Sequence, residues 1–168
     1  MRGFKHLEAH TTGELLTIEP TKDWELVKRI VTHQSVYPRV SDDKSPSAER
    51  WLPLDGLHYL LVKNGADILG LFVLSQENGV CFKVHTCLLP HSYGEKATIA
   101  AKALIAWVFT HLDCSRLVTE VPDYNRLALK FAERSGMTKF GYNPKSYLKD
   151  GKLHGVTLLG ISKEEACQ

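Results

Sequence analysis

Residues 84–111 decide the fold class, and they read VHTCLLPHSYGEKATIAAKALIAWVFTH. The segment begins as an apolar strand, and Gly94 then allows the chain to turn. In residues 97–108 nearly every side chain is apolar, and a helix that is apolar almost all round is buried on most sides. The stretch therefore predicts a strand, a glycine turn and a helix that lies inside the core of the domain.

A second strand and a second helix follow this unit. Residues 117–121 read LVTEV, a strand pattern, and the next helix ends at Gly136, which suits the left-handed geometry found after a helix. A helix that connects two strands of one sheet makes them parallel, so residues 80–89 and 117–121 are expected to be parallel neighbours. Ligands of such sheets bind at the carboxyl ends of the strands, which places a candidate site at residues 90–97.

Two hairpin signals precede this unit. Asn64-Gly65 and Asn78-Gly79 each join apolar stretches, and a type I′ turn favours such pairs because both of its central residues need positive φ. The two turns divide the chain into strands at residues 58–63, 67–74 and 80–89. An antiparallel meander is therefore expected before the parallel pair.

The N-terminal part predicts one strand and one helix. Residues 13–20 form a first strand that ends at Pro20. Apolar residues at helical spacing begin at Trp24. This helix is expected to run to about Tyr37, because Pro38 disfavours helical geometry in the residue before it.

The remaining segments complete the predicted domain. Residues 41–56 have no hydrophobic period and predict a long loop, which in a compact domain is often functional. The last two strands are expected at residues 139–142 and 156–161, joined by a loop that contains Pro and Gly. Together the elements predict one domain over residues 1–168 of the α/β (α+β) class. We expect a central mixed sheet of about six to seven strands, with an antiparallel N-terminal meander and helices on both faces.

The composition is that of a globular protein, and it excludes several classes. The 168 residues are 43% hydrophobic and carry 21 basic and 19 acidic side chains, a balance that gives no reason to expect a nucleic-acid partner. No apolar run reaches the roughly 20 residues of a membrane span, and the N-terminus lacks the apolar segment of a secretory signal. The four cysteines show no zinc spacing, so we expect no metal site and a cytoplasmic protein with reduced cysteines.

The turn at residues 90–97 has the features of an anion site. A helix N-terminus presents backbone N–H groups and a partial positive charge, so phosphates bind there readily. Gly94 permits a ligand to approach the backbone, and Lys96 adds a positive charge. A plain strand-to-helix connection is the alternative, since a lone glycine turn is a weak signal.

Two stretches resemble motifs of the GCN5-related N-acetyltransferase (GNAT) family. Residues 88–97, LLPHSYGEKA, are similar to the family's acyl-CoA loop, in which a strand ending V-x-P precedes Arg or Gln, two residues, Gly, one residue, and Gly or Ala. Asn125 and Ala128, followed by Gly136-Met137, are similar to the later motif N-x-x-A that ends in G-F. The element order resembles the family along nearly the whole chain and so implies a GNAT-like single domain.

The chain departs from the family pattern at three positions. Tyr93 stands where a basic or amide residue is expected, Lys96 where a second glycine often lies, and Met137 where Phe is usual. The chain therefore resembles a degenerate member of the family. The His85-Thr86 pair ahead of the loop is similar to sequences carried by bacteriophages, so the resemblance also suggests a phage-encoded protein.

The resemblance implies acetyl-CoA as the co-substrate and assigns residues to it. The backbone of Leu88 and Leu89 would pair with the pantetheine arm, and the two parallel strands would splay apart to admit the thioester. Asn125 would bond the pantetheine arm or cap its helix, and Phe131 would pack against the cofactor. The N–H groups expected to hold the pyrophosphate belong to five consecutive residues, Tyr93, Gly94, Glu95, Lys96 and Ala97.

Acetyl transfer to an amine needs a base for the amine and an acid for the departing thiolate. Family members often use as acid a Tyr seven residues after the Asn, but this chain has Ala132 there, which leaves Tyr124 or another residue to take the role. His85 is the base candidate, because an unperturbed His pKa lies near neutrality. A histidine that is hydrogen-bonded within the sheet is the alternative. Glu120 on the neighbouring strand is a second candidate, and Cys87 is expected in the core rather than as a nucleophile.

The acceptor side is expected at the first helix and the loop after it, which usually shape specificity in the family. Residues 41–56 would therefore determine which acceptor binds. Side chains considered for the wall of its pocket are Trp51, Tyr59, His33 and Tyr37, each of which could equally be a packing residue.

The leading hypothesis is an N-acyltransferase that transfers an acetyl group from acetyl-CoA to a primary amine by direct attack in a ternary complex. The acceptor is a small molecule or a protein, with no nucleic-acid or membrane partner expected, and a homodimer is left open. The alternative is a catalytically inactive GNAT-fold protein that acts through protein–protein contacts. A Rossmann-type nucleotide-binding protein is disfavoured by the antiparallel meander at residues 58–89.

Overall fold

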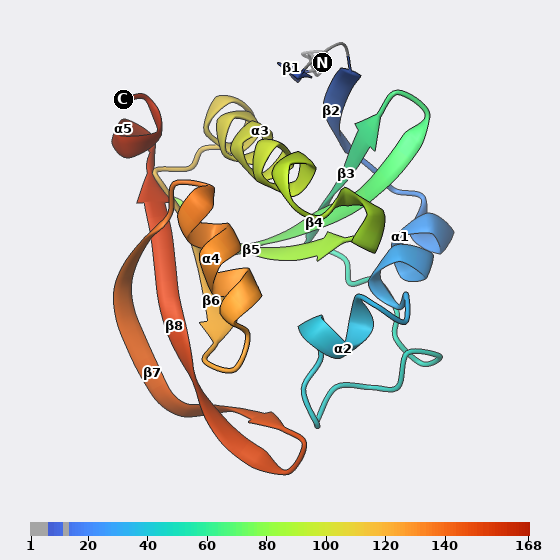
Figure 1. The fold of residues 1–168 in the computed structure, drawn as a ribbon, viewed down its shortest axis with the longest axis vertical. Coiled ribbons are helices and arrows are strands. Elements are labelled where there is room, and N and C mark those ends of the chain that lie inside the picture. The colour runs from blue at the N-terminus through green and yellow to red at the C-terminus, as the bar shows by residue number, and fades with distance from the viewer. Residues whose placement is uncertain (1–6, 12–13) are drawn as a thin grey trace.

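The computed structural model describes residues 7–11 and 14–168, whose strands form one mixed sheet with helices on both faces (Figure 1). The described sheet has eight strands in the order β1-β2-β3-β4-β5-β6-β8-β7. The strands are β1 (Leu7–Thr11), β2 (Glu14–Pro20), β3 (His58–Asn64), β4 (Asp67–Asn78), β5 (Cys81–Leu88), β6 (Arg116–Pro122), β7 (Thr138–Lys149) and β8 (Lys152–Ser162). The helices are α1 (Trp24–Val31), α2 (Tyr37–Val40), α3 (Glu95–His111), α4 (Arg126–Arg134) and α5 (Lys163–Ala166), with a 3-10 turn η1 (Pro90–Ser92). The predicted fold class is confirmed, and β1 is an additional strand.

The N-terminal half of the sheet is the predicted antiparallel meander. β2, β3, β4 and β5 pair with one another in chain order, although Gly13, where the first predicted strand began, lies outside the described residues. The type I′ turn predicted at Asn64-Gly65 is wrong. Asn64 pairs with Asp67, so Gly65 and Ala66 are the central residues, and Gly65 has a φ of 58°. A glycine at the first central position favours a type II′ turn instead.

The first helix is shorter than predicted. α1 ends at Val31, and α2 begins at Tyr37 with Pro38 in its first turn. The prediction of one helix from Trp24 to about Tyr37 is wrong, because the fixed φ and missing N–H of proline also suit the start of a helix. Asp23 caps α1 by accepting a hydrogen bond from the Leu26 N–H at 3.0 Å.

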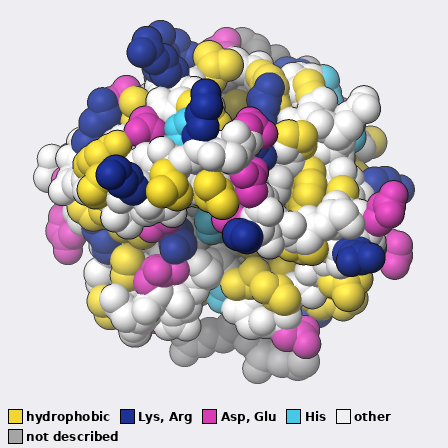
Figure 2. All heavy atoms as spheres, turned by 90° about the horizontal axis from the view of Figure 1, so that it is seen from below, with side chains coloured by type: hydrophobic (Ala, Val, Ile, Leu, Met, Phe, Trp, Pro, Cys, Tyr) yellow, Lys and Arg dark blue, Asp and Glu magenta, His cyan; other side chains and the backbone are white. Residues whose placement is uncertain are grey.

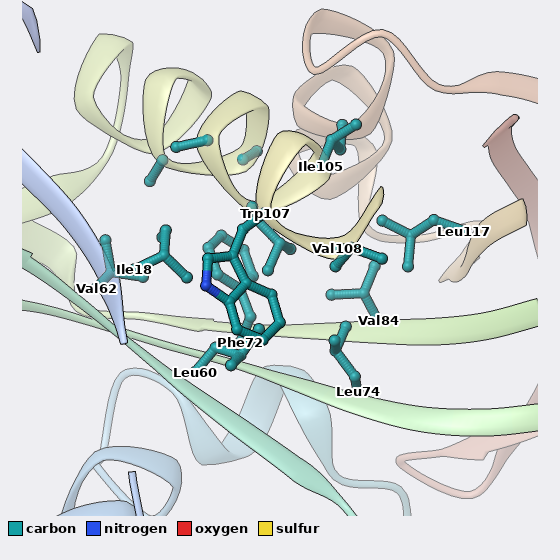
Figure 3. Close-up of a cluster of buried hydrophobic side chains, with 14 of the residues drawn as sticks. Ile18, Leu60, Val62, Phe72, Leu74, Val84, Ile105, Trp107, Val108 and Leu117 are labelled. Carbon is teal, nitrogen blue, oxygen red and sulfur yellow. The ribbon is translucent and has the colours of Figure 1, made fainter. Parts of the chain in front are cut away.

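α3 packs against one face of the sheet and forms the main core (Figure 3). Trp107 and Val108 of α3 point toward Phe72 of β4 and Leu60 of β3, and all four side chains are buried. Each fully buried side chain of this size contributes about 1.5–3 kcal/mol. The predicted burial of α3 is therefore confirmed. Among the described helices, none is both long and apolar enough to cross a membrane.

α1 covers the opposite face of the same strands. Val27 and Ile30 of α1 pack against Tyr59 of β3, Leu71 of β4 and Cys87 of β5, and these five residues are buried. β5 is therefore held by apolar contacts on both of its faces, which fixes the direction in which the chain leaves the sheet after Leu88.

The C-terminal hairpin is longer than predicted. β7 and β8 extend to a turn at Asp150-Gly151, so the loop expected between residues 142 and 156 is wrong. The ladder has an irregularity between Asn143 and Tyr147, which accommodates Pro144 without ending the strand. The tip of the hairpin reaches the segment that follows α2 (Figure 1).

Candidate active site

β5 and β6 diverge midway along their length. Their parallel pairing consists of three residue pairs and ends at Lys83 and Val118, although both strands continue beyond this point. The Thr119 hydroxyl donates to the Val84 carbonyl at 3.0 Å just past the last pair. The predicted parallel pairing and splaying are therefore confirmed, and the two strands diverge beyond these residues.

The turn after β5 orders the start of α3. Ser92 is buried, and its hydroxyl donates to the Leu89 carbonyl at 2.7 Å. Gly94 is the N-cap residue and has φ of 89° and ψ of −133°, a conformation that residues with a side chain avoid. The first helical hydrogen bond runs from the Thr98 N–H to the Gly94 carbonyl at 3.2 Å. The N–H groups of residues 95–97 precede this bond and point out of the helix end.

Tyr93 is the first of the five residues of the predicted anion-binding turn, and it precedes the N-cap of α3. Its N–H donates to the Pro90 carbonyl at 3.2 Å inside η1. A Cβ placed on Gly94 would meet none of the described atoms within 4 Å, so the turn is open on that side. The N–H groups at the helix start are those of Gly94, Glu95, Lys96 and Ala97.

The backbone of Leu88 and Leu89 is fixed from the β4 side. The Leu89 N–H donates to the Leu69 carbonyl at 2.8 Å. Gly70 lies so close that a Cβ there would come within 2.4 Å of the Cys87 carbonyl oxygen, and its φ of 136° also favours glycine. The opposite edge of this strand end is not paired with β6, because β6 has already diverged.

Arg39 of α2 brings a positive charge to the turn. Its Nη1 donates to the Tyr93 hydroxyl at 2.7 Å, and its guanidinium carbon lies 5.1 Å from the centre of the Tyr93 ring. The side chains of Arg39 and Tyr93 are both exposed. Tyr93 occupies the position where the family motif has a basic or amide residue. In this chain the positive charge beside that position comes from Arg39.

His85 and Glu120 lie on the face of the sheet that carries α1, because side chains alternate along β5 and β6. Their neighbour Lys83 lies 3.8 Å from Glu120 and 3.5 Å from Glu77, measured from its Nζ to a carboxylate oxygen. His85 is solvent-accessible, yet the surrounding protein limits its hydration and lowers its pKa. The charge of Lys83 lowers this pKa further, and Glu120 and Glu77 oppose the shift. His85 is therefore held mainly in the neutral form that a base requires.

The start of α4 carries the second predicted motif. The Asn125 side-chain oxygen accepts a hydrogen bond from the Ala128 N–H at 3.1 Å and so caps the helix. Phe131 is half-buried and packs against the main core. Ala132 is buried, with 5% of its surface exposed, so α4 offers no acid at the usual position. Gly136 ends the helix with a φ of 101°, in the left-handed geometry that was predicted.

Tyr124 belongs to a small group of side chains at the end of β6. Its ring lies edge-on to His154 at 4.7 Å between centroids and 6.3 Å from the ring of Tyr147. Burial raises the pKa of Tyr124, whereas a hydrogen bond from the Tyr147 hydroxyl lowers it. Burial also raises the pKa of Tyr147, and the charge of Tyr124 would raise it further. The contact between the two hydroxyls therefore favours the charged form of Tyr124 over that of Tyr147.

Cys87 is a core residue. It is buried between β4 and α1, and burial raises its pKa to about 12. A thiol with this pKa is almost entirely protonated at pH 7 and is therefore a poor nucleophile. The four cysteines at positions 81, 87, 114 and 167 are all free.

Aromatic side chains considered for the acceptor wall mainly hold the long loop. The Tyr37 hydroxyl donates to the Pro46 carbonyl, and the Tyr59 hydroxyl accepts from the Leu54 N–H at 2.9 Å. His33 accepts from the Ser35 N–H at 3.1 Å, and Trp51 packs at the edge of the α1 cluster.

Comparisons with known proteins agree with this geometry at the level of the fold. No protein-family profile matches the sequence, and no curated protein shows significant sequence similarity to it. A spermidine N-acetyltransferase from Vibrio cholerae, solved in complex with CoA and spermine, aligns with a TM-score of 0.76 at 14% identity, over 91% of this chain and 98% of that one. A probable acetyltransferase aligns with a TM-score of 0.71 at 16% identity, over 95% and 98%. The chain has the GNAT fold.

Three residues near the proposed site could not be predicted from the sequence. Arg39 contacts Tyr93, Asp43 contacts the hairpin tip, and Tyr147 contacts Tyr124. No local pattern marks them, because each contact joins segments that are far apart in the chain. Only the loss of the usual Tyr at Ala132 signals that an acid must come from elsewhere.

Proposed function

We propose that this protein is an N-acetyltransferase that moves the acetyl group of acetyl-CoA to a primary amine by direct attack. The observation that carries the proposal is the divergence of β5 and β6, together with the N-terminus of α3 that follows β5 and has no side-chain cap. The neighbour from Vibrio cholerae supports it, because that protein has the same fold and was solved with CoA and spermine.

The described residues fit a thioester carrier with a diphosphate. The N–H groups of Gly94, Glu95, Lys96 and Ala97 hold the pyrophosphate at the helix N-terminus, where the open side of Gly94 admits it. The free edge of Leu88 and Leu89 pairs with the pantetheine arm, Asn125 contacts the same arm with its remaining amide donors, and Phe131 packs beside it. Arg39 adds a cation near the phosphates.

The chemistry moves two protons while one C–N bond forms and one C–S bond breaks. Acetyl-CoA supplies the activated acetyl thioester. His85 takes the proton of the attacking amine, directly or through water, because its lowered pKa leaves it neutral at pH 7. Tyr124 gives its proton to the leaving sulfur, and the hydrogen bond from Tyr147 stabilises the phenolate that results. Glu120 lies near His85 and attracts the cationic amine.

Thermal shift and thiol release together test the proposal. Acetyl-CoA at a hundred times its dissociation constant should raise the melting temperature by roughly 5–10 °C, and ATP, a phosphate-rich control, should raise it much less. Addition of a primary amine should then release free CoA thiol. The absence of a shift at millimolar acetyl-CoA contradicts the proposal.

The second candidate is a non-catalytic GNAT-fold protein that acts through protein contacts, and the buried Ala132 favours it. It predicts that acetyl-CoA binds weakly or not at all and that no amine releases thiol. A cytoplasmic location, a phage origin and a homodimer stay predictions of the sequence.

A further inference from the structure

A small pocket lies between α1 and the segment in which β5 leads into η1. Its volume is about 240 Å³. The residues that line it from the helix side are Leu26, Arg29, Ile30 and His33, which follow one another at the spacing of a single helical face. His91 lines it from the η1 side. The pocket is therefore enclosed by one face of α1, continued into the turn after it, and by the start of η1.

Most of the lining is apolar. Ile30 is buried, and Leu26, Ile68 and Leu89 are partly buried where they pack against the core beneath α1. Pro90 adds a further apolar surface. Leu89 contributes its side chain here, whereas only its backbone edge belongs to the proposed cofactor site. A ligand of this pocket needs an apolar body, because such a body gains by leaving water for an apolar lining.

The polar side chains of the lining are all basic. They are Arg29, His33 and His91, and none of the described residues that line the pocket is acidic. The His33 Nδ1 accepts from the Ser35 N–H at 3.1 Å, so the neutral ring carries its proton on Nε2, which is a donor. The His91 Nε2 lies 3.2 Å from a carboxylate oxygen of Asp67. The Arg29 guanidinium is exposed and has no hydrogen bond or ion pair with the part of the chain that the structure describes.

This concentration of basic side chains is local. The chain carries 21 basic and 19 acidic side chains in all. Figure 2 shows the two kinds interspersed over the hairpin end of the molecule. The attraction of an anion to the pocket therefore comes from the pocket's own lining rather than from a positive field over the whole protein.

We infer that this pocket binds a small free monocarboxylate with an apolar body. The volume is below the roughly 300–1,000 Å³ of sites for drug-sized ligands, so it suits a molecule of about eight non-hydrogen atoms. The carboxylate accepts hydrogen bonds from Arg29 and from the His33 Nε2–H, and such charge-assisted bonds are stronger than neutral ones. A free phosphate satisfies the basic groups but not the apolar lining, and an alkylamine does the reverse. The inference goes beyond the proposed function, since it requires neither acetyl-CoA nor an amine.

Titration of the isotope-labelled protein with sodium hexanoate, followed by NMR in the absence of acetyl-CoA, tests the inference. Hexanoate should bind with a Kd of about 0.1–1 mM, as expected for a ligand of this size. The amide signals that move should be those of residues 26–33, 89 and 91. Hexylamine and hexanol lack the anionic group and acetate lacks the apolar chain, so each should bind at least about ten-fold more weakly.

Arg29→Gln should weaken hexanoate binding about ten-fold, because it removes a charge-assisted hydrogen bond. It should leave the weak binding of hexanol unchanged. Arg50→Gln is the matched control, since it removes an exposed arginine that does not line the pocket, and it should affect neither ligand. If Arg29→Gln does not fold, the comparison of hexanoate with hexylamine in the wild type decides.

The inference is overturned if hexanoate does not bind at ten times the expected Kd, if hexylamine binds as tightly as hexanoate, or if Arg29→Gln binds hexanoate as the wild type does. Signal changes confined to residues 94–97 also overturn it, because they place the carboxylate at the start of α3. None of these results bears on the proposed function, which depends on acetyl-CoA binding and thiol release.

Discussion

The proposed cofactor side is one continuous segment, whereas the proposed acceptor side is assembled from separate ones. The turn from Leu88 to Ala97 follows directly from β5, and the φ of Gly94 and the start of α3 fix its shape. The acceptor side instead combines Arg39, Asp43 and Tyr147, which come from α2, the long loop and the C-terminal hairpin. The two sides therefore depend on different kinds of interaction.

This difference predicts different local stabilities. The cofactor turn rests on buried groups such as Ser92 and on backbone geometry. The acceptor side is held by hydrogen bonds whose side chains, such as those of Arg39 and Asp43, are exposed. Exposed hydrogen bonds with little buried apolar surface open at low free energy. The proposed acceptor side should consequently change conformation more readily than the proposed cofactor side.

Gly94→Trp should have the largest effect on acetyl-CoA binding, because Gly94 has the most constrained backbone conformation of the proposed cofactor turn. A side chain at φ of 89° and ψ of −133° strains the backbone, and the indole fills the open space before the helix. The acetyl-CoA thermal shift should disappear. Gly79→Trp is the control, since Gly79 is exposed, has an ordinary φ and has no described atom near its Cβ position. A persisting shift in Gly94→Trp would show that the pyrophosphate binds elsewhere.

His85→Gln should lower kcat by about 100-fold and leave acetyl-CoA affinity unchanged, because it removes a base without touching the cofactor turn. The pH profile gives a second readout. Neutral His85 is the active form and its pKa is lowered, so wild-type activity should persist below pH ~6.5 and fall as the pH drops through the lowered pKa. This acidic limb should vanish in the variant. His58→Gln is the control, since His58 is an exposed histidine on β3, and this variant should behave as the wild type. Unchanged turnover in His85→Gln would show that His85 is not the base.

Arg39→Gln should have the smallest effect on acetyl-CoA affinity. Arg39 connects α2 to the proposed cofactor turn, but its side chain is exposed. An exposed cation near a phosphate contributes modestly, so acetyl-CoA affinity should fall about three- to ten-fold at low salt and less at high salt. Calorimetry at two salt concentrations measures this. Arg50→Gln, which removes another exposed arginine from the same loop region, should have no effect. Equal affinities for Arg39→Gln and the wild type would restrict Arg39 to its structural contact with Tyr93.

Much of the fold was predictable from sequence because its signals are local. The alternation in β5, the glycine at 94 and the apolar α3 predict their own structures, and the helix crossover then makes β5 and β6 parallel. The end of α1 was not predictable, because Pro38 is compatible with ending one helix or starting another. The length of the final hairpin was missed for a similar reason, since the irregularity around Pro144 preserves a ladder that proline normally interrupts.

The candidate site was predictable only on its continuous side. The Asn125 cap and the turn at Gly94 follow from residues that are close in sequence. Arg39 and Tyr93 are 54 positions apart, and Asp43 and Asp150 are 107 apart. Such contacts arise from the way the sheet brings its two ends together, and a single sequence carries no spacing rule for them.

The hydrogen bond between Arg39 and Tyr93 has a thermodynamic consequence. It joins α2 to the proposed cofactor turn. A ligand that draws Arg39 away from Tyr93 removes this contact, and a ligand that repositions α2 moves Arg39. By linkage the coupling is reciprocal, so whatever the first substrate does to the affinity for the second, the second does to the affinity for the first.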